Sequence, residues 1–163
     1  METTVKNTYK KLGFDKTEAT ELVESLNVLL CNYMVLYQKI RNFHWNVTGA
    51  EFYDVHEKFE EEYLRAAEDI DDVAERVRIL GFTPTSTLKE YLSQADIEEP
   101  SGQIAAMDMV RAIVADYETL ISFIVDAIDL ASEHGDVGTK EMLQAMLLGK
   151  EEKHWMFSAF VAE

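Results

Sequence analysis

The sequence predicts an all-α protein built as a bundle of four long helices. Only two prolines and seven glycines interrupt its 163 residues. They fall between long stretches in which apolar residues recur every three or four positions, as on the buried face of a helix. With 47% hydrophobic residues, the chain can form a core without disulfides or a structural metal. We expect one domain over residues 1–163, with residues 1–14 as a flexible N-terminal tail.

The first two long helices have recognisable ends. Asp15 and Glu18 have the spacing of a capping box, which predicts a helix from near Asp15 to near Gly49. The second is expected from about Tyr53 to Leu80, where GFTP supplies the glycine and proline that commonly end helices. Their apolar stripes are expected to form the core: Leu22, Leu26, Leu29, Tyr33, Leu36 and Ile40 on the first, and Val55, Phe59, Tyr63, Ile70, Val73 and Val77 on the second.

A long connection separates these helices from the last two. It contains the short helical segment STLKEYLSQAD, and long helices are then expected from about Ser101 to Glu133 and from about Thr139 to Ala162. Their packing residues are expected to be Ile104, Met107, Val114, Ile121, Ile124 and Ile128 on the third, and Met142, Met146, Trp155 and Phe160 on the fourth. A short extra helix in the long connection between helices two and three favours a ferritin-like four-helix bundle over a simple up-down one.

Composition excludes several classes of function. With 31 acidic and 15 basic residues, the net charge of -16 repels nucleic acid and anionic lipid and attracts metal cations, although a merely soluble surface has the same excess. The first residues lack the apolar core of a signal peptide, and no apolar run approaches the roughly 18 residues of a membrane span. Cys31 is the single cysteine, expected as a small buried hydrophobe. We therefore expect a cytoplasmic protein without membrane contact.

The second helix carries two pairs of candidate metal ligands. His56, Glu60, Asp71 and Glu75 are spaced by 4, 11 and 4 residues. At about 100° per residue they lie within about 100° of one another around the helix axis. However, His56 and Asp71 are about 22 Å apart along that axis, whereas a metal holds its ligands at about 2 Å. One helix therefore carries two half sites that cannot meet.

A second copy of the chain would complete both half sites. An antiparallel two-fold partner lays the His56 end of one helix beside the Asp71 end of the other and creates two identical sites per dimer. His44, just before the GA turn, is expected to fold back beside His56. Such ligands suit Fe(II), and also Zn(II), Co(II) or Mn(II). Each pair alone also fits a solvated helix face, on which Glu75 could simply pair with a neighbouring arginine.

The segment HWNVTGAEFYDVHEKFEEEY, followed by DIDDVAER, resembles the Dps family, the miniferritins named as DNA-binding proteins from starved cells. The resemblance covers nearly the whole chain, including KHWMFSAF near its end. It implies a hollow dodecamer built from two-fold dimers. It also implies oxidation of Fe(II), usually with hydrogen peroxide, at an intersubunit ferroxidase centre, storage of Fe(III) mineral, and protection against oxidative stress.

The resemblance also implies roles for single residues. His44 and His56 match the two family histidines, and Asp71 and Glu75 match the carboxylates that the facing subunit contributes. Glu60 departs from the aspartate usual in the family, and the added methylene leaves open whether it is a direct ligand. Iron is the expected metal, with Zn(II) or other divalent ions able to occupy the site.

Two further features follow from the resemblance. Trp45 matches an aromatic residue that lies beside the centre and takes part in electron transfer. Without the resemblance, a tryptophan at this position is more often a core residue. Acidic pores on three-fold axes admit iron in the family. The corresponding segment SEHGDVGTKEML offers Glu133, Asp136 and Glu141, which also fit a solvated acidic loop.

Other functions fit the sequence less well. Strong DNA binding is not expected, because the lysines of the N-terminal segment are few and interspersed with acids, while binding to phosphates needs clustered cations. A true ferritin builds its di-iron site inside one bundle from two Glu-x-x-His motifs, and only Glu151–His154 is present. A shell that has lost its chemistry is the remaining alternative, which an iron oxidation assay would separate from the active one.

Overall fold

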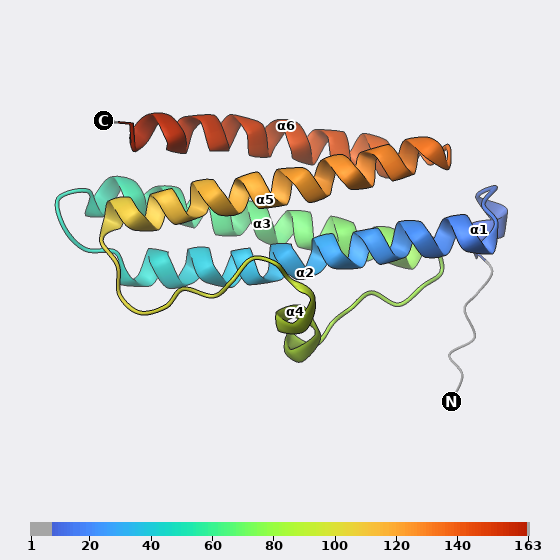
Figure 1. Cartoon of the computed structure of the whole chain (residues 1–163), viewed down its shortest axis with the longest axis horizontal. Coiled ribbons are helices and arrows are strands. Elements are labelled where there is room, and N and C mark those ends of the chain that lie inside the picture. Colours follow the sequence, from blue (N-terminus) through green and yellow to red (C-terminus); the bar gives the residue numbers. More distant parts are fainter. Residues whose placement is uncertain (1–7, 163) are drawn as a thin grey trace.

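The computed structural model describes residues 8–162, and all regular secondary structure in that range is helical. Its six helices are α1 (Thr8–Lys11), α2 (Lys16–Asn46), α3 (Phe52–Ile79), α4 (Leu88–Gln94), α5 (Ala106–Glu133) and α6 (Val137–Phe160). The four long ones form a bundle, with α4 in the connection between α3 and α5 (Figure 1). The predicted fold class and the extra helix are thereby confirmed.

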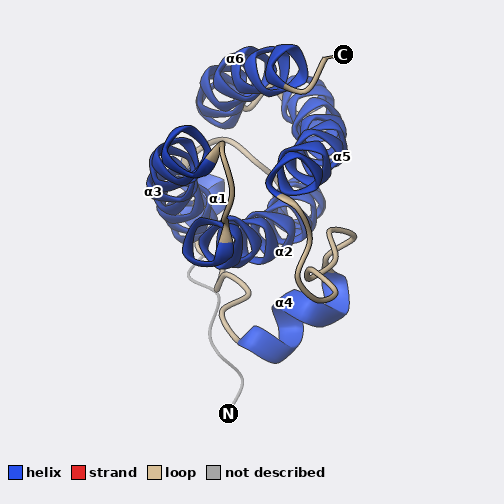
Figure 2. Cartoon of the chain, turned by 90° about the vertical axis from the view of Figure 1, so that its left-hand side faces the viewer, coloured by secondary structure: helices blue, strands red, loops and turns tan. Residues whose placement is uncertain are grey.

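The long connection decides the topology of the bundle. It returns from the end of α3 to the end at which α3 began, so α3 and α5 run in the same direction (Figure 1). Helix α2 packs on α3 and on α5, and α5 packs on α6. Seen along its length, the bundle encloses one core, and α4 lies outside it beside α2 (Figure 2). This arrangement is the ferritin-like one.

The predicted ends of the first two helices are confirmed in atomic detail. Asp15 Oδ1 accepts hydrogen bonds from the backbone N–H of Thr17 and of Glu18. In return, the Asp15 backbone N–H donates to Glu18 Oε2 at 2.8 Å. Helix α3 ends before Gly81, whose φ of 94° a side chain would strain. The Phe82 N–H then bonds back to the Val77 carbonyl at 3.1 Å, which closes the last turn.

The core confirms the α2 stripe in full and most of the α3 stripe, but Ile104, predicted to pack on the third long helix, is exposed, and two residues predicted to pack on α6 also lie outside. Trp155 is 67% exposed and Phe160 is 42% exposed, whereas Phe157 is buried. The inward positions of α6 recur at residues 139, 143, 146, 150 and 157. Trp155 falls about 200° around the axis from residue 157, so it faces away from the core.

Two segments near the helix ends also differ from the prediction. Helix α5 begins at Ala106 instead of near Ser101, because Gly102 has a φ of 79° that a right-handed helix cannot include. The N-terminal tail was expected to be flexible over residues 1–14. Residues 1–7 lie outside the described part, but residues 8–14 include α1, whose Tyr9 is buried beside Phe82 at 6.0 Å between ring centroids. That second half of the segment is therefore part of the packed structure.

Candidate metal centre

His44 and His56 meet at the end of the α2–α3 hairpin. Their rings stack with centroids 3.8 Å apart and planes 20° from parallel. Each ring donates its Nδ1–H to the backbone carbonyl of the other residue, and both N–O distances are 2.8 Å. The predicted fold-back of His44 onto His56 is confirmed, and the two imidazoles form one rigid unit.

The turn between the helices makes this stacking possible. Helix α2 ends at Asn46, Val47 is buried in an extended conformation, and Gly49 turns the chain with a φ of 112°. Helix α3 then begins at Phe52, only eight residues after His44. Because the loop is this short, the last turn of α2 and the first turn of α3 lie side by side.

Neighbouring aromatic rings enclose the histidine pair. The Phe52 ring stacks on the free face of His56 at 4.9 Å between centroids. The Tyr63 ring packs edge-on against His44 at 5.3 Å. His44 is buried, while His56 is partly exposed, so solvent reaches the pair from the His56 side. Packing on both sides keeps the imidazoles in one orientation.

The reciprocal hydrogen bonds also fix which nitrogen can bind a metal. In a neutral imidazole only one nitrogen carries a proton. Since Nδ1 of both rings donates to a carbonyl, Nε2 of both rings keeps its lone pair. A carbonyl that accepts from the distal N–H of a ligating histidine is the usual second layer of a metal site. One nitrogen of each ring is thus left available as a candidate metal ligand.

Asp71 and Glu75 form the other half site on the same helix. Both are exposed, and neither forms an ion pair with another described residue. The adjacent arginine Arg76 pairs with Asp136 instead, and Arg78 donates to the Phe82 carbonyl at 2.7 Å. The alternative that Glu75 is simply neutralised by its neighbours is therefore wrong for the described chain. The two carboxylates remain free to bind a cation.

Glu60 and Trp45 lie around the histidine half. Glu60 is exposed, and its Oε1 accepts a hydrogen bond from the Tyr63 hydroxyl at 3.4 Å. Trp45 is 58% exposed, so it is not a core residue of the single chain. The Arg41 guanidinium lies over the Trp45 ring, 4.7 Å from its centroid, in a cation–π contact. A large aromatic side chain left this open is available for contact with another molecule.

Within the described residues, no three His, Cys, Asp or Glu side chains gather closely enough to hold a metal. The single chain thus has a two-nitrogen half site at one end of α3 and a two-carboxylate half site about four helical turns away. This separation agrees with the spacing argument from the sequence.

Comparisons with known proteins match the whole bundle. Residues 23–163 match the ferritin-like domain family. The DNA protection during starvation protein of Brevibacillus brevis is 43% identical over 90% of this chain and 99% of its own. The chain belongs to the Dps family of ferritin-like proteins.

Solved structures agree with this membership. A Dps protein from Bacillus brevis superimposes with a TM-score of 0.88 at 40% identity, covering 91% of this chain and 100% of that one. The Dps protein of Vibrio cholerae gives 0.90 at 34% identity, covering 93% and 95%, and is described as a member of a broad superfamily of ferritin-like diiron-carboxylate proteins. The Dps chain thus belongs to an iron-storing, ferritin-like class. Over its described residues, no helix is long and apolar enough to cross a membrane.

The residues predicted for an iron pore divide into two groups in this Dps chain. Glu133 and Glu141 are exposed, whereas Asp136 is 2% exposed. Asp136 Oδ1 accepts from Arg76 Nη2 at 2.6 Å and from the backbone N–H of Thr139 at 3.0 Å, and Oδ2 accepts from the Thr139 hydroxyl. The Asp136 carboxylate therefore caps the N-terminus of α6 and links that helix to α3 through Arg76. Because the carboxylate is buried and paired, Asp136 is not assigned to a pore.

The sequence analysis missed a group of buried ionisable residues in the bundle. Glu62, Asp69 and Lys150 are each at most 2% exposed. A signal was present, because Glu62 and Asp69 fall into the same three-and-four spacing as the apolar stripe of α3. They are not part of either half site.

Proposed function

We propose that this Dps protein is a miniferritin that oxidises Fe(II), with hydrogen peroxide as oxidant, at a centre shared between two subunits. It then stores the Fe(III) as mineral inside a hollow dodecamer and so protects the cell against oxidative damage. The observation that carries the proposal is the division of ligands along α3. A rigid two-histidine half site and a free two-carboxylate half site lie too far apart to serve one metal in one chain.

A two-fold dimer would bring these half sites together. His44 and His56 of one subunit would face Asp71 and Glu75 of the other, and the symmetry would create two such centres. An apolar groove between α2 and α4, lined in part by Tyr37, Leu88 and Leu92, supports a contact on this side. Leu88 and Leu92 are exposed in the single chain. A second copy is the occupant that also completes the metal ligands.

Each residue has a distinct part in the proposed reaction. Nε2 of His44 and of His56 would bind Fe(II), which accepts imidazole ligands well. Asp71 and Glu75 would supply the negative charge that favours Fe(III) once it forms. Glu60, held by Tyr63, would assist at a second iron position. Trp45 would lie beside the centre and take part in electron transfer.

The reaction balances without a radical. Each of two Fe(II) ions gives up one electron, and one hydrogen peroxide molecule takes both, together with two protons, to become two water molecules. Because the two electrons leave from neighbouring ions, no hydroxyl radical need be released. The exposed acids Glu133 and Glu141 remain proposed residues of a pore that admits iron. Strong DNA binding is not part of the proposed function.

Anaerobic mixing of purified protein with Fe(II) and hydrogen peroxide tests the activity. We expect two Fe(II) oxidised per peroxide, little trapping of hydroxyl radical, and a particle of roughly 220 kDa by light scattering if twelve 18.7 kDa chains assemble. An assembled particle that oxidises iron no faster than buffer would identify an inert shell. A stable monomer would contradict the shared centre itself.

A further inference from the structure

The buried face of α3 carries two carboxylates at positions where apolar residues are expected. Glu62 and Asp69 are 2% and 1% exposed. They are two helical turns apart, so both point into the bundle. A buried carboxylate is costly unless cations or hydrogen-bond donors compensate for its lost water. The groups that compensate here come from the three other long helices and from α3 itself.

Helix α6 supplies two of the cations. Lys150 is 2% exposed, and its Nζ lies 3.3 Å from Asp69 Oδ2. Lys153, one turn further along, places its Nζ 3.1 Å from Glu62 Oε1. Arg65 on α3 adds a third contact, 3.0 Å from Nη2 to Asp69 Oδ1. Positive charge thus stands directly between α3 and α6.

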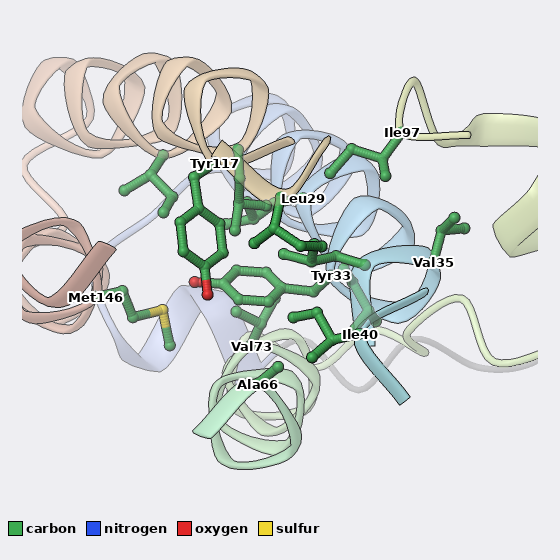
Figure 3. Packing of buried hydrophobic residues seen from close by; sticks show 14 of the residues in the cluster. Leu29, Tyr33, Val35, Ile40, Ala66, Val73, Ile97, Tyr117 and Met146 are labelled. Atoms are coloured by element: carbon green, nitrogen blue, oxygen red, sulfur yellow. The ribbon is translucent and has the colours of Figure 1, made fainter. Parts of the chain in front are cut away.

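Helices α2 and α5 each add a buried tyrosine. The hydroxyl groups of Tyr33 and Tyr117 point toward the same place in the bundle interior (Figure 3). The Tyr117 hydroxyl donates to Glu62 Oε2 at 2.5 Å. Lys150 Nζ lies 5.7 Å from the Tyr33 ring centroid and 5.4 Å from that of Tyr117. One ammonium group therefore lies among oxygens and ring faces from three helices.

The contacts of Asp69 are electrostatic and not directional. Neither of its buried oxygens has a hydrogen bond of normal geometry, although two cations lie within 3.3 Å and the buried Tyr33 hydroxyl interacts with the same carboxylate. Carboxylate oxygens that attract a cation without accepting a directed hydrogen bond from it resemble the ligands of a hard metal ion. The surroundings of Lys150 are thus suited to a cation in general.

The same four helices hold the metals in ferritin-like di-iron proteins. There, a Glu from each of two helices and a Glu-x-x-His pair from each of the other two project inward. In this chain the polar groups around Glu62 and Asp69 have a similar distribution over the helices. The buried ones are Tyr33 from α2, Glu62 from α3, Tyr117 from α5 and Lys150 from α6, and Arg65 of α3 and Lys153 of α6 reach toward them from more exposed positions. The paired residues keep the three-residue spacing, but cationic side chains replace the histidines and one acid.

We propose that the bundle interior holds a second cation site, formed by Asp69 and the two tyrosine hydroxyls, and that the ammonium group of Lys150 occupies it. The lysine would exclude divalent metal from the interior of each chain and leave Fe(II) to the half sites on the surface of α3. This inference concerns cation binding alone, so it can fail while the proposed oxidation chemistry stands.

Lys150→Glu tests the proposal, because it removes the resident cation and adds an oxygen ligand beside Asp69. The probe is Mn(II), which prefers oxygen ligands. We expect the variant to bind one more Mn(II) per chain than the wild type, and its thermal unfolding midpoint to rise with Mn(II). Lys58→Glu makes the same charge change at an exposed position and serves as the control for binding to the acidic surface.

The position of the ion decides the outcome. Anomalous scattering from Mn(II)-soaked crystals should place a peak between Asp69 and α6 in Lys150→Glu, and none there in the wild type or in Lys58→Glu. Manganese found only on the surface would overturn the proposal. If Lys150→Glu does not fold even with Mn(II), the Lys150→Gln variant is soaked in the same way. Its side chain is uncharged and, like that of Lys150→Glu, offers an oxygen ligand. The absence of an interior peak there overturns the proposal too.

Discussion

The imidazole rings of His44 and His56 stack with their centroids 3.8 Å apart, and Nδ1–H of each ring donates a hydrogen bond to the backbone carbonyl of the other residue. The contact is reciprocal, so neither histidine is oriented without the other. It joins the last turn of α2 to the first turn of α3. The ability of this end of the molecule to bind metal therefore depends on the hairpin turn as well as on the two side chains.

Removing either histidine should reduce iron oxidation. His44→Ala deletes one ligand and frees the ring of His56, so we expect the initial rate of peroxide-dependent Fe(II) oxidation to fall at least about tenfold. His56→Ala should have the same effect. His154→Ala is the matched control, because that histidine pairs with Glu118 at an exposed position elsewhere. Rates equal to those of the control would contradict the assignment.

The hairpin turn should be sensitive at Gly49. Its φ of 112° strains any side chain, although a Cβ there would meet only the end of Glu51 at 3.6 Å. We expect Gly49→Ala to cost about 1–2 kcal/mol of folding free energy, measured by denaturant unfolding. Gly149→Ala, in the middle of α6 with open space around it, should instead stabilise the protein by about 0.5–1 kcal/mol. Equal effects of the two substitutions would contradict this reading of the turn.

The Arg76–Asp136 pair should make stability depend on acid pH. Burial alone would raise the pKa of Asp136, but hydrogen bonds from Arg76 and Thr139 outweigh burial and hold the pKa below its ordinary value. A carboxyl with a lowered folded-state pKa contributes stability at pH values above its unfolded pKa, and that stability is lost as pH falls through the folded one.

Replacing the arginine tests this dependence. Arg76→Ala should destabilise the protein by about 3 kcal/mol at neutral pH, because it leaves a buried carboxylate without its cation. The difference from the wild type should shrink as the pH falls through the lowered pKa of Asp136, because below it the carboxyl is protonated in both proteins. Urea unfolding at several pH values measures it. A difference that stays constant down to about pH 2 would show that the pair is not the cause.

Cys31 should be unreactive in the folded protein. Burial, and then the negative charge of Glu90, raise the pKa of its thiol to about 11. Near pH 8 only about one thiol in a thousand is then ionised, and the side chain is fully buried. We expect a thiol reagent to label the native chain far more slowly than the chain in denaturant. Equal labelling rates would show that α2 opens readily at this position.

Zn(II) should compete with iron for the shared centre. It accepts the same imidazole and carboxylate ligands but cannot be oxidised. Protein loaded with Zn(II) before mixing should therefore oxidise Fe(II) slowly, and a chelator should restore the rate. Oxidation that continues unchanged at saturating Zn(II) would locate the chemistry elsewhere.

The sequence predicted those features that depend on spacing along one helix. The capping box at Asp15, the glycine stop after α3 and the separation of His56 from Asp71 are local properties, and all three are confirmed. The fold-back of His44 followed from a short turn. Contacts between helices distant in the sequence were not predictable in this way.

Asp136 and Lys150 illustrate that limit. The resemblance to the family predicted Asp136 as a pore residue, and nothing near it in the sequence showed that Arg76, 60 residues earlier, would pair with it. The ion pair of Asp69 with Lys150 likewise joins α3 to α6. Trp155 was predicted to pack in the core, although the period of the inward positions of α6 places it on the outer face.

Mixing two inactive variants tests the shared centre most directly. His56→Ala and Asp71→Asn should each be inactive, since each damages every site in its own assembly. After unfolding together and reassembly, a mixed dimer holds one site with both halves intact and one with both damaged. Random pairing then predicts recovery of about a quarter of the wild-type rate of Fe(II) oxidation. A mixture as inactive as its two parents would show that the two half sites never meet across subunits.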